Sequence, residues 1–144
     1  ICPLIKGIGW GGALTPPQLK RRLEDKRMDK VYIISRYRAF TESGMEFNRR
    51  VARYFCRQVV LEGKIPVAPH LFYTQFLDES QEKERQIGLD IGLKELREAD
   101  EFLLIIIGGR ISEGMRREIR QATRDGMRGR VVYMTRKEIK EVIG

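Results

Sequence analysis

The 144-residue chain has few of the residues that build metal centres and disulfide frameworks. It contains two cysteines, Cys2 and Cys56, and one histidine, His70. This set is too small for a disulfide framework or an ordinary zinc site, so no metal and no cofactor are expected. Cys56 falls within a helical pattern, where a small buried hydrophobic residue is the simplest interpretation. A reducing cytoplasm is the expected compartment.

Long apolar runs are also missing. The most apolar segment, residues 102–107, has the length of a strand and is far shorter than the about 18 residues that span a bilayer. Residues 1–27 lack the basic start, apolar centre and small-residue cleavage site of a signal peptide. We interpret them as an appendage, either a tag-like extension or a docking arm. Residues 28–144, which begin at Met28, are then one domain.

The charge balance is basic. Lys and Arg number 28 and Asp and Glu number 20, so the net charge is 28 − 20 = +8. A basic balance favours partners that carry phosphate, including nucleotides and nucleic acid. The arginines, however, are spread over several helical patterns instead of forming one block, which is more typical of a solvated surface. A small molecule is therefore the expected partner, and neither nucleic acid nor a membrane is expected.

Strand-like and helix-like patterns alternate along the domain. Apolar, β-branched segments predict strands at residues 30–35, 65–70, 100–107 and 130–134. Helical periodicity and end signals predict helices at residues 43–61, 80–99, 112–126 and from 135 onward. Capping-box spacings at Ser43 and Thr135 mark the starts of the first and last of these helices. Residues 71–79 are aromatic without a clear period, and we interpret them as a loop or lid.

This alternation predicts an α/β fold with parallel strands and right-handed crossovers. We expect a three-layer, doubly wound, Rossmann-like or flavodoxin-like sheet of four or five strands in the order 2-1-3-4. Ligands of such sheets bind beyond the carboxyl ends of the strands, where the strand order reverses. This rule collects residues 35–38, His70 and residues 108–114 around one crevice.

The segment "FLLIIIGGRISEGMRREI", residues 102–119, joins a strand to a helix through two glycines. Gly108 and Gly109 occupy the place of a phosphate-cradling turn, but their spacing fits neither the dinucleotide fingerprint nor the P-loop. A tight turn that permits close packing is the alternative, and both interpretations stay open. Ser112 is a natural N-cap, and the free N–H groups of the helix that follows favour an anion in the crevice.

Helical geometry separates the two glutamates of this segment. At 100° per residue, Met115, Ile119 and Ala122 share the face that packs on the sheet, and Glu113 lies nearly opposite. Glu118 lies about 60° from the centre of the packed face, so we expect a half-buried carboxylate. A carboxylate there needs a partner. It either forms a salt bridge with a neighbouring arginine or serves the crevice.

The segment "SRYR" after the first strand supplies further candidates. Ser35 is suited to contact a ligand hydroxyl or phosphate, and Tyr37 to stack on a base or position a carboxylate. Arg36 or Arg38 is suited to bind phosphate through two hydrogen bonds. A polar loop with one partly buried aromatic side chain is the alternative.

Two more titratable residues fall near the expected crevice. His70 ends the second predicted strand and is either a hydrogen-bonded rim residue or a catalytic group. Asp90, in the second predicted helix, is either a second acid of the crevice or an exposed residue.

Four segments together resemble a nucleoside 2-deoxyribosyltransferase-like family, in its largely uncharacterised bacterial and phage branch. They are "KVYIISRYR", "GKIPVAPHLFYTQFLDE", "GLDIGLKELREADEFLLI" and "GGRISEGMRREI". In that family a Gly is followed four positions later by a nucleophilic Glu, a spacing that Gly114 and Glu118 match. The resemblance implies attack of the carboxylate on C1′ of a nucleoside, with Tyr37 orienting Glu118, and retaining glycosyl transfer. It also implies a homo-oligomer.

The chain departs from the family pattern at two acids. Ser112 stands where the family usually has an Asp, and Gly92 stands at another such position, with Asp90 nearby. The basic loop with Arg36 and Arg38 points toward a phosphorylated substrate, as in nucleotide N-glycosidases. Two functions follow: cleavage or exchange of an N-glycosidic bond, or a non-catalytic nucleotide-binding or sensor module that uses the same crevice.

Overall fold

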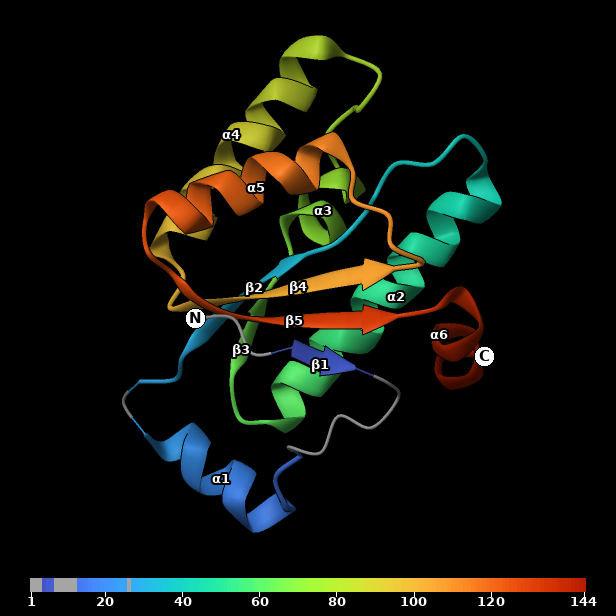
Figure 1. The fold of residues 1–144 in the computed structure, drawn as a ribbon. Helices are drawn as coiled ribbons and strands as arrows, with labels where there is room; N and C mark the ends of the chain where they lie inside the picture. Colours follow the sequence, from blue (N-terminus) through green and yellow to red (C-terminus); the bar gives the residue numbers. More distant parts are fainter. Residues whose placement is uncertain (1–3, 7–12, 26) are drawn as a thin grey trace.

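Five parallel strands form one sheet in the computed structural model of the chain, which describes residues 4–6, 13–25 and 27–144 (Figure 1). The strands lie in the order β1-β5-β4-β2-β3. Their bounds are β1 Leu4–Lys6, β2 Lys30–Ile34, β3 Ile65–Val67, β4 Glu101–Ile107 and β5 Arg128–Met134. The four predicted strands correspond to β2 to β5, so the predicted parallel order 2-1-3-4 is confirmed.

Helices cover both faces of the sheet and complete three layers (Figure 1). The helices α4 (Glu82–Glu98) and α5 (Glu113–Arg124) pack on one face, and α2 (Glu42–Leu61) and α6 (Arg136–Ile143) on the other. Residues of β2 and β4 alternate between two apolar cores because successive side chains of a strand point to opposite faces. Val31 and Ile33 belong to the core under α2 and α6, whereas Tyr32 and Ile34 belong to the core under α4 and α5.

The predicted appendage contributes one strand at the sheet edge and one helix. Strand β1 pairs in parallel with β5, and α1 (Pro16–Glu24) lies toward the amino-terminal ends of the strands (Figure 1). The backbone amide of Leu14 donates to the carbonyl of Leu61, which ties the segment before α1 to the end of α2. Cys2 lies outside the described residues. The interpretation of residues 1–27 as a separate extension stays a prediction.

The start of α2 differs from the prediction. The N-cap is Thr41, not Ser43, because the Thr41 hydroxyl accepts a hydrogen bond from the backbone amide of Gly44 at 3.0 Å. Two caps were predicted correctly. Ser112 accepts from the Met115 amide at the start of α5, and Thr135 forms a capping box with Glu138 at the start of α6.

The segment after β3 also differs from the prediction. The strand ends at Val67, and the short helix α3 (Pro69–Phe72) and the 3-10 turn η1 (Tyr73–Gln75) replace the predicted strand end and loop. Proline at the first helical position has a backbone angle suited to a helix and needs no amide partner. The Thr74 hydroxyl donates to the carbonyl of His70, which closes the turn. His70 is therefore a helical residue and not a strand residue.

Gly129, a buried glycine of β5, provides a stability test. Gly129 of β5 pairs with Phe102 of β4, and a Cβ atom there would lie 2.3 Å from the buried Phe102 ring. We expect Gly129→Ala to lower the free energy of unfolding by about 1–3 kcal/mol, the usual cost of overpacking. Urea denaturation measures it. In the control Gly114→Ala, the new Cβ meets nothing closer than Ser112 Oγ at 3.9 Å, so no loss is expected. Equal stability of the two variants would contradict the packing argument.

Candidate active site

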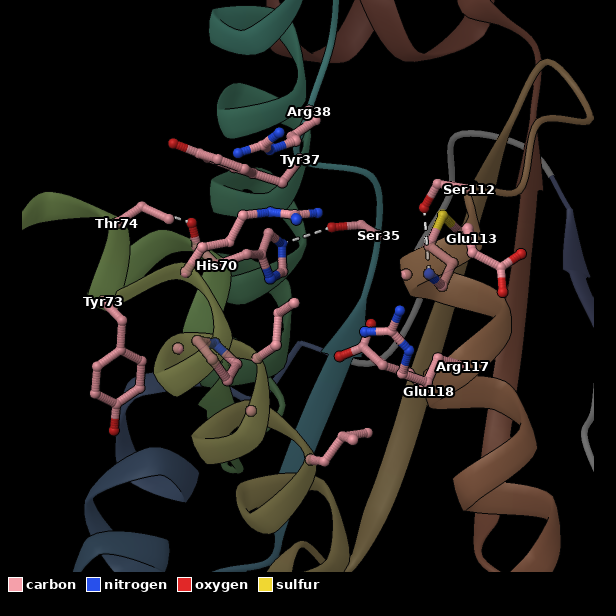
Figure 2. A pocket seen from close by; sticks show the side chains of 18 of the residues that line it. Ser35, Tyr37, Arg38, His70, Tyr73, Thr74, Ser112, Glu113, Arg117 and Glu118 are labelled. Atoms are coloured by element: carbon pink, nitrogen blue, oxygen red, sulfur yellow. Dashed lines mark hydrogen bonds between the residues drawn. The ribbon is translucent and has the colours of Figure 1, made fainter. Parts of the chain in front are cut away.

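A cavity of about 320 Å³ lies beyond the carboxyl end of β2, between α3, α4 and α5 (Figure 2). Strand β2 has β3 on one side and β4 on the other, so the cavity lies where the strand order reverses. The volume is in the range of small-molecule sites. Of the predicted site residues, these line it: Ser35, Tyr37, Arg38, His70, Ser112, Gly114 and Glu118.

Glu118 is the carboxylate that the cavity holds in place. It projects from the second turn of α5, where Met115 and Ala122 are buried against the sheet, and its side chain is half-buried as the helical geometry predicted. The phenol of Tyr32, a buried residue of β2, donates a hydrogen bond to Glu118 Oε2. A strand and a helix, both anchored in the core, therefore fix the position of this carboxylate.

Burial sets the protonation of this pair. Removal from water raises the pKa of Glu118 to about 7, while the hydrogen bond from Tyr32 and the charge of Arg117 act in the opposite direction. The pKa of the Tyr32 phenol is raised, mainly by burial and secondly by the negative charge of Glu118. The phenol therefore keeps its proton and acts as a donor. Near neutral pH, Glu118 is available both as an acid and as a carboxylate.

The alternative prediction for Glu118 was a salt bridge, but the glutamate of α5 that forms one is Glu113. Glu113 is exposed and pairs with Arg120 at 3.3 Å. No ion pair joins Glu118 to an arginine or lysine in the part of the chain that the structure describes, although Arg117 lies beside it in Figure 2. The predicted difference between the two glutamates is therefore present in the structure.

Ser35 and His70 form a second polar pair in the cavity. The Ser35 hydroxyl lies 2.8 Å from His70 Nε2 (Figure 2). Desolvation lowers the pKa of His70 to about 4, so its ring is neutral at pH 7. A neutral imidazole bonded to a buried hydroxyl can donate or accept hydrogen bonds without adding charge. The pair is suited to contact polar edges of a ligand.

Comparison with known proteins places the chain in a family and a fold. The model of a family described as "Domain of unknown function (DUF7768)" matches residues 29–132, which is well over half of the chain. The chain belongs to this family. Among solved structures, it is similar to a 2-deoxyribosyltransferase from Bacillus psychrosaccharolyticus, with 17% identity, a TM-score of 0.55 and 72% of each chain covered. This likeness shows that the two proteins share a fold. No curated protein matches the chain by sequence.

The role predicted for Tyr37 in this DUF7768 member needs correction. Tyr37 lines the cavity, but Tyr32 and not Tyr37 contacts Glu118. Tyr37 lies in the loop beyond β2, and its ring meets the edge of His70 at a centroid distance of 6.4 Å. Tyr32, three residues before the loop, points from the strand toward α5. Tyr32 could have been recognised as a phenol in a buried strand, which requires a hydrogen-bond partner.

Other predicted residues of the DUF7768 chain lie outside this cavity. Asp90 is exposed and accepts a hydrogen bond from Gln86 at 2.9 Å, which makes it a surface residue of α4. Arg36 points into a second, smaller cavity. Gly108 and Gly109 have φ angles of 63° and 70°, form a tight left-handed turn after β4 and line neither cavity.

Gly92 and Ser112, the two positions at which the sequence departs from the pattern that it resembles, both line the cavity. A Cβ atom at Gly92 would lie 3.4 Å from the Tyr32 hydroxyl, so a carboxylate there would project toward the Tyr32–Glu118 pair. Ser112 caps α5 with its side chain and exposes the helix N-terminus to the cavity. Arg38 lies on the rim, where it donates to the carbonyl of Glu79 at 3.3 Å. The α5 N-terminus and Arg38 therefore offer donors suited to an anion, although Glu79 and Glu113 also line the cavity.

The described part of the chain offers neither a candidate metal site nor a candidate membrane span. It contains no group of three His, Cys, Asp or Glu side chains that could hold a metal ion. None of its helices combines the length and the apolar character needed to cross a bilayer.

The raised pKa of Glu118 makes fold stability depend on pH. Between pH 4.5 and about 7 the unfolded chain ionises this carboxyl while the folded chain keeps the proton, so rising pH lowers the free energy of unfolding. Above pH 7 the penalty is complete and amounts to about 3 kcal/mol. We expect Glu118→Gln to match the wild type near pH 4 and to exceed its stability by about this amount at pH 8. Urea midpoints at both pH values measure it, and a difference that is constant with pH would contradict the assignment.

Proposed function

We propose that the chain cleaves or exchanges the N-glycosidic bond of a nucleoside or nucleotide, with Glu118 as nucleophile. The observation that carries the proposal is the pairing of a half-buried Glu118 with the Tyr32 phenol inside the cavity. A carboxylate held in a fixed position by a neutral donor is the arrangement that attack on an anomeric carbon requires. The shared fold with a 2-deoxyribosyltransferase supports this choice of chemistry by analogy.

The first step forms a glycosyl ester. The Glu118 carboxylate attacks C1′, the C1′–N bond breaks, and its electron pair leaves with the base, which takes up a proton from solvent. The Tyr32 phenol holds the nucleophilic carboxylate in line with C1′ and favours its ionised form. The transition state has oxocarbenium character, so the negative charge of Glu118 stabilises it as it forms.

The second step regenerates the enzyme. Water attacks C1′ of the glycosyl ester, loses a proton and releases the sugar, and the Glu118 carboxylate is restored. A second nucleobase in place of water gives base exchange instead. Both outcomes retain the configuration at C1′ because two displacements occur in sequence.

The polar lining supports a proposed place for each part of the substrate. The N-terminus of α5 with Ser112, and Arg38 on the rim, are suited to a 5′-phosphate. Tyr37, with its ring against His70, offers an aromatic surface for the base, and the Ser35–His70 pair offers hydrogen bonds. A nucleoside 5′-monophosphate is therefore the substrate class that we propose first.

Base release tests the proposal directly. The protein is incubated with 2′-deoxynucleosides, ribonucleosides and their 5′-monophosphates, and free base is measured by chromatography, with and without a second base. We expect free base from at least one monophosphate, and a new nucleotide when exchange occurs. Binding of a monophosphate without release of base would overturn the catalytic proposal.

Binding of a monophosphate without release of base would support the second candidate function, a non-catalytic nucleotide-binding module. The replacement of family acids by Gly92 and Ser112 inside the cavity favours it, because these positions would otherwise supply further carboxylates for handling the base.

A further inference from the structure

A second cavity, of about 30 Å³, lies on the opposite face of the sheet, beyond the carboxyl ends of β2 and β4. Its apolar wall consists of Val51 of α2 and Ile105 of β4, which belong to the core under α2 and α6. Three arginines from three separate segments line it: Arg36, Arg110 and Arg136. No carboxylate occurs among the described residues that line this cavity, which we call the arginine cavity.

Local structure directs two of the arginines into this cavity. The left-handed turn at Gly108 and Gly109 folds the chain back after β4, so that the Arg110 amide donates to the carbonyl of Ile107 at 3.3 Å. Arg136 is the first residue of α6, and its guanidinium lies 4.4 Å from the centre of the Phe47 ring. Stacking on this ring leaves the N–H groups at the edge of the guanidinium directed elsewhere.

The third arginine has an unmet hydrogen-bonding requirement. Arg36 Nε is buried and has no hydrogen-bond partner in the described part of the chain. Buried donors are nearly always paired in folded proteins. Arginines that share a cavity without a carboxylate also repel one another. An anion between the three arginines would accept from their accessible guanidinium N–H groups and relieve the repulsion.

We propose that the arginine cavity binds a phosphoryl group, either of inorganic phosphate or of a small phosphomonoester. A phosphate dianion carries more negative charge and more acceptor oxygens than a carboxylate, so it suits three guanidiniums better. At about 30 Å³ the cavity is too small for a base or a sugar, so only a small anionic group can enter it. Ser35 lines both cavities, so the bound anion would lie beside the nucleoside cavity without occupying it. This inference is independent of the proposed glycosidic activity.

Thermal unfolding with added ligand tests the arginine cavity. Inorganic phosphate at 10 mM is compared with sodium chloride at equal ionic strength, because salt alone changes surface electrostatics. Saturating binding is expected to raise the Tm of the wild type by about 3 °C. The double variant Arg110→Gln/Arg136→Gln should lose the rise. The control Arg57→Gln removes one positive charge from an exposed position of α2 and should keep it.

A second ligand, a second variant and calorimetry distinguish inorganic phosphate from an organic phosphate and locate the bound anion. Protection by ribose 5-phosphate but not by inorganic phosphate, lost in the double variant, would support the site and assign an organic ligand. Protection that survives in the double variant but disappears in Ser112→Ala would place the anion at α5 and overturn the proposal. Calorimetric titration of the wild type does not depend on any variant folding. The absence of heat with both ligands would overturn the proposal as well.

Discussion

Glu118→Gln is expected to abolish base release, with a loss of at least about 10⁴-fold in kcat, as for removal of a nucleophile. The amide has nearly the shape of the carboxylic acid but cannot attack C1′ or carry the sugar as an ester. The hydrogen bond from Tyr32 has an acceptor in the amide oxygen, so the fold and the cavity should be retained. Chromatography of free base over long incubations measures the residual rate.

Glu113→Gln is the matched control for this prediction, since it makes the same substitution on the same helix. Glu113 is exposed and pairs with Arg120, so its loss should change kcat by about fivefold at most. Mass spectrometry of the wild type, quenched during turnover, should detect a glycosyl adduct on the peptide that contains Glu118. Equal activity of the Glu118→Gln variant and the wild type would refute a nucleophilic role.

The position of Glu118 could be predicted because α5 is strongly amphipathic. The buried side chains of Met115 and Ala122 set the rotation of the helix, and this rotation places Glu118 on the flank of the packed face. The N-cap at Ser112 set the start of the helix independently. The strand order followed in the same way from alternation of strands and helices, because crossover handedness leaves few topologies.

The partner of Glu118 could not be found by the same means. Strand β2 is buried on both faces, so "VYII" shows no alternation from which to assign Tyr32 to one side. In a strand, an error of one position moves a side chain to the other face. The same uncertainty applied to the loop that follows, where Arg36 lines the arginine cavity and Arg38 lines the larger cavity.

Short elements were the other source of error. Helix α3 has 4 residues and η1 has 3, too few for a hydrophobic period to appear. Their backbone is held by side-chain hydrogen bonds to local carbonyls, such as Thr74 to His70, which depend on the turn having already formed. His70 was expected beside the crevice in either case, because both interpretations place it just after β3.

Tyr32→Phe is expected to lower kcat/KM at pH 7 by about 10- to 100-fold. In the proposed mechanism, attack needs the ionised form of Glu118, so kcat/KM of the wild type should rise with pH and level off above the pKa of about 7. The Tyr32 hydrogen bond favours that ionised form, and its removal raises the pKa of Glu118 further. The acid limb of the profile should therefore move to higher pH, with partial recovery of the rate in alkaline buffer.

The shift of the limb separates this positioning role from general damage to the fold. Tyr37→Phe removes a hydroxyl from the same cavity but not from Glu118, so any loss of rate there should leave the limb where it is in the wild type. Loss of packing or of substrate affinity in Tyr32→Phe would lower the whole profile without moving it. A limb that stays near pH 7 in Tyr32→Phe would show that Tyr32 does not control the ionisation of Glu118. This substitution removes the hydrogen bond to the Glu118 carboxylate, and that loss is the effect expected to move the limb.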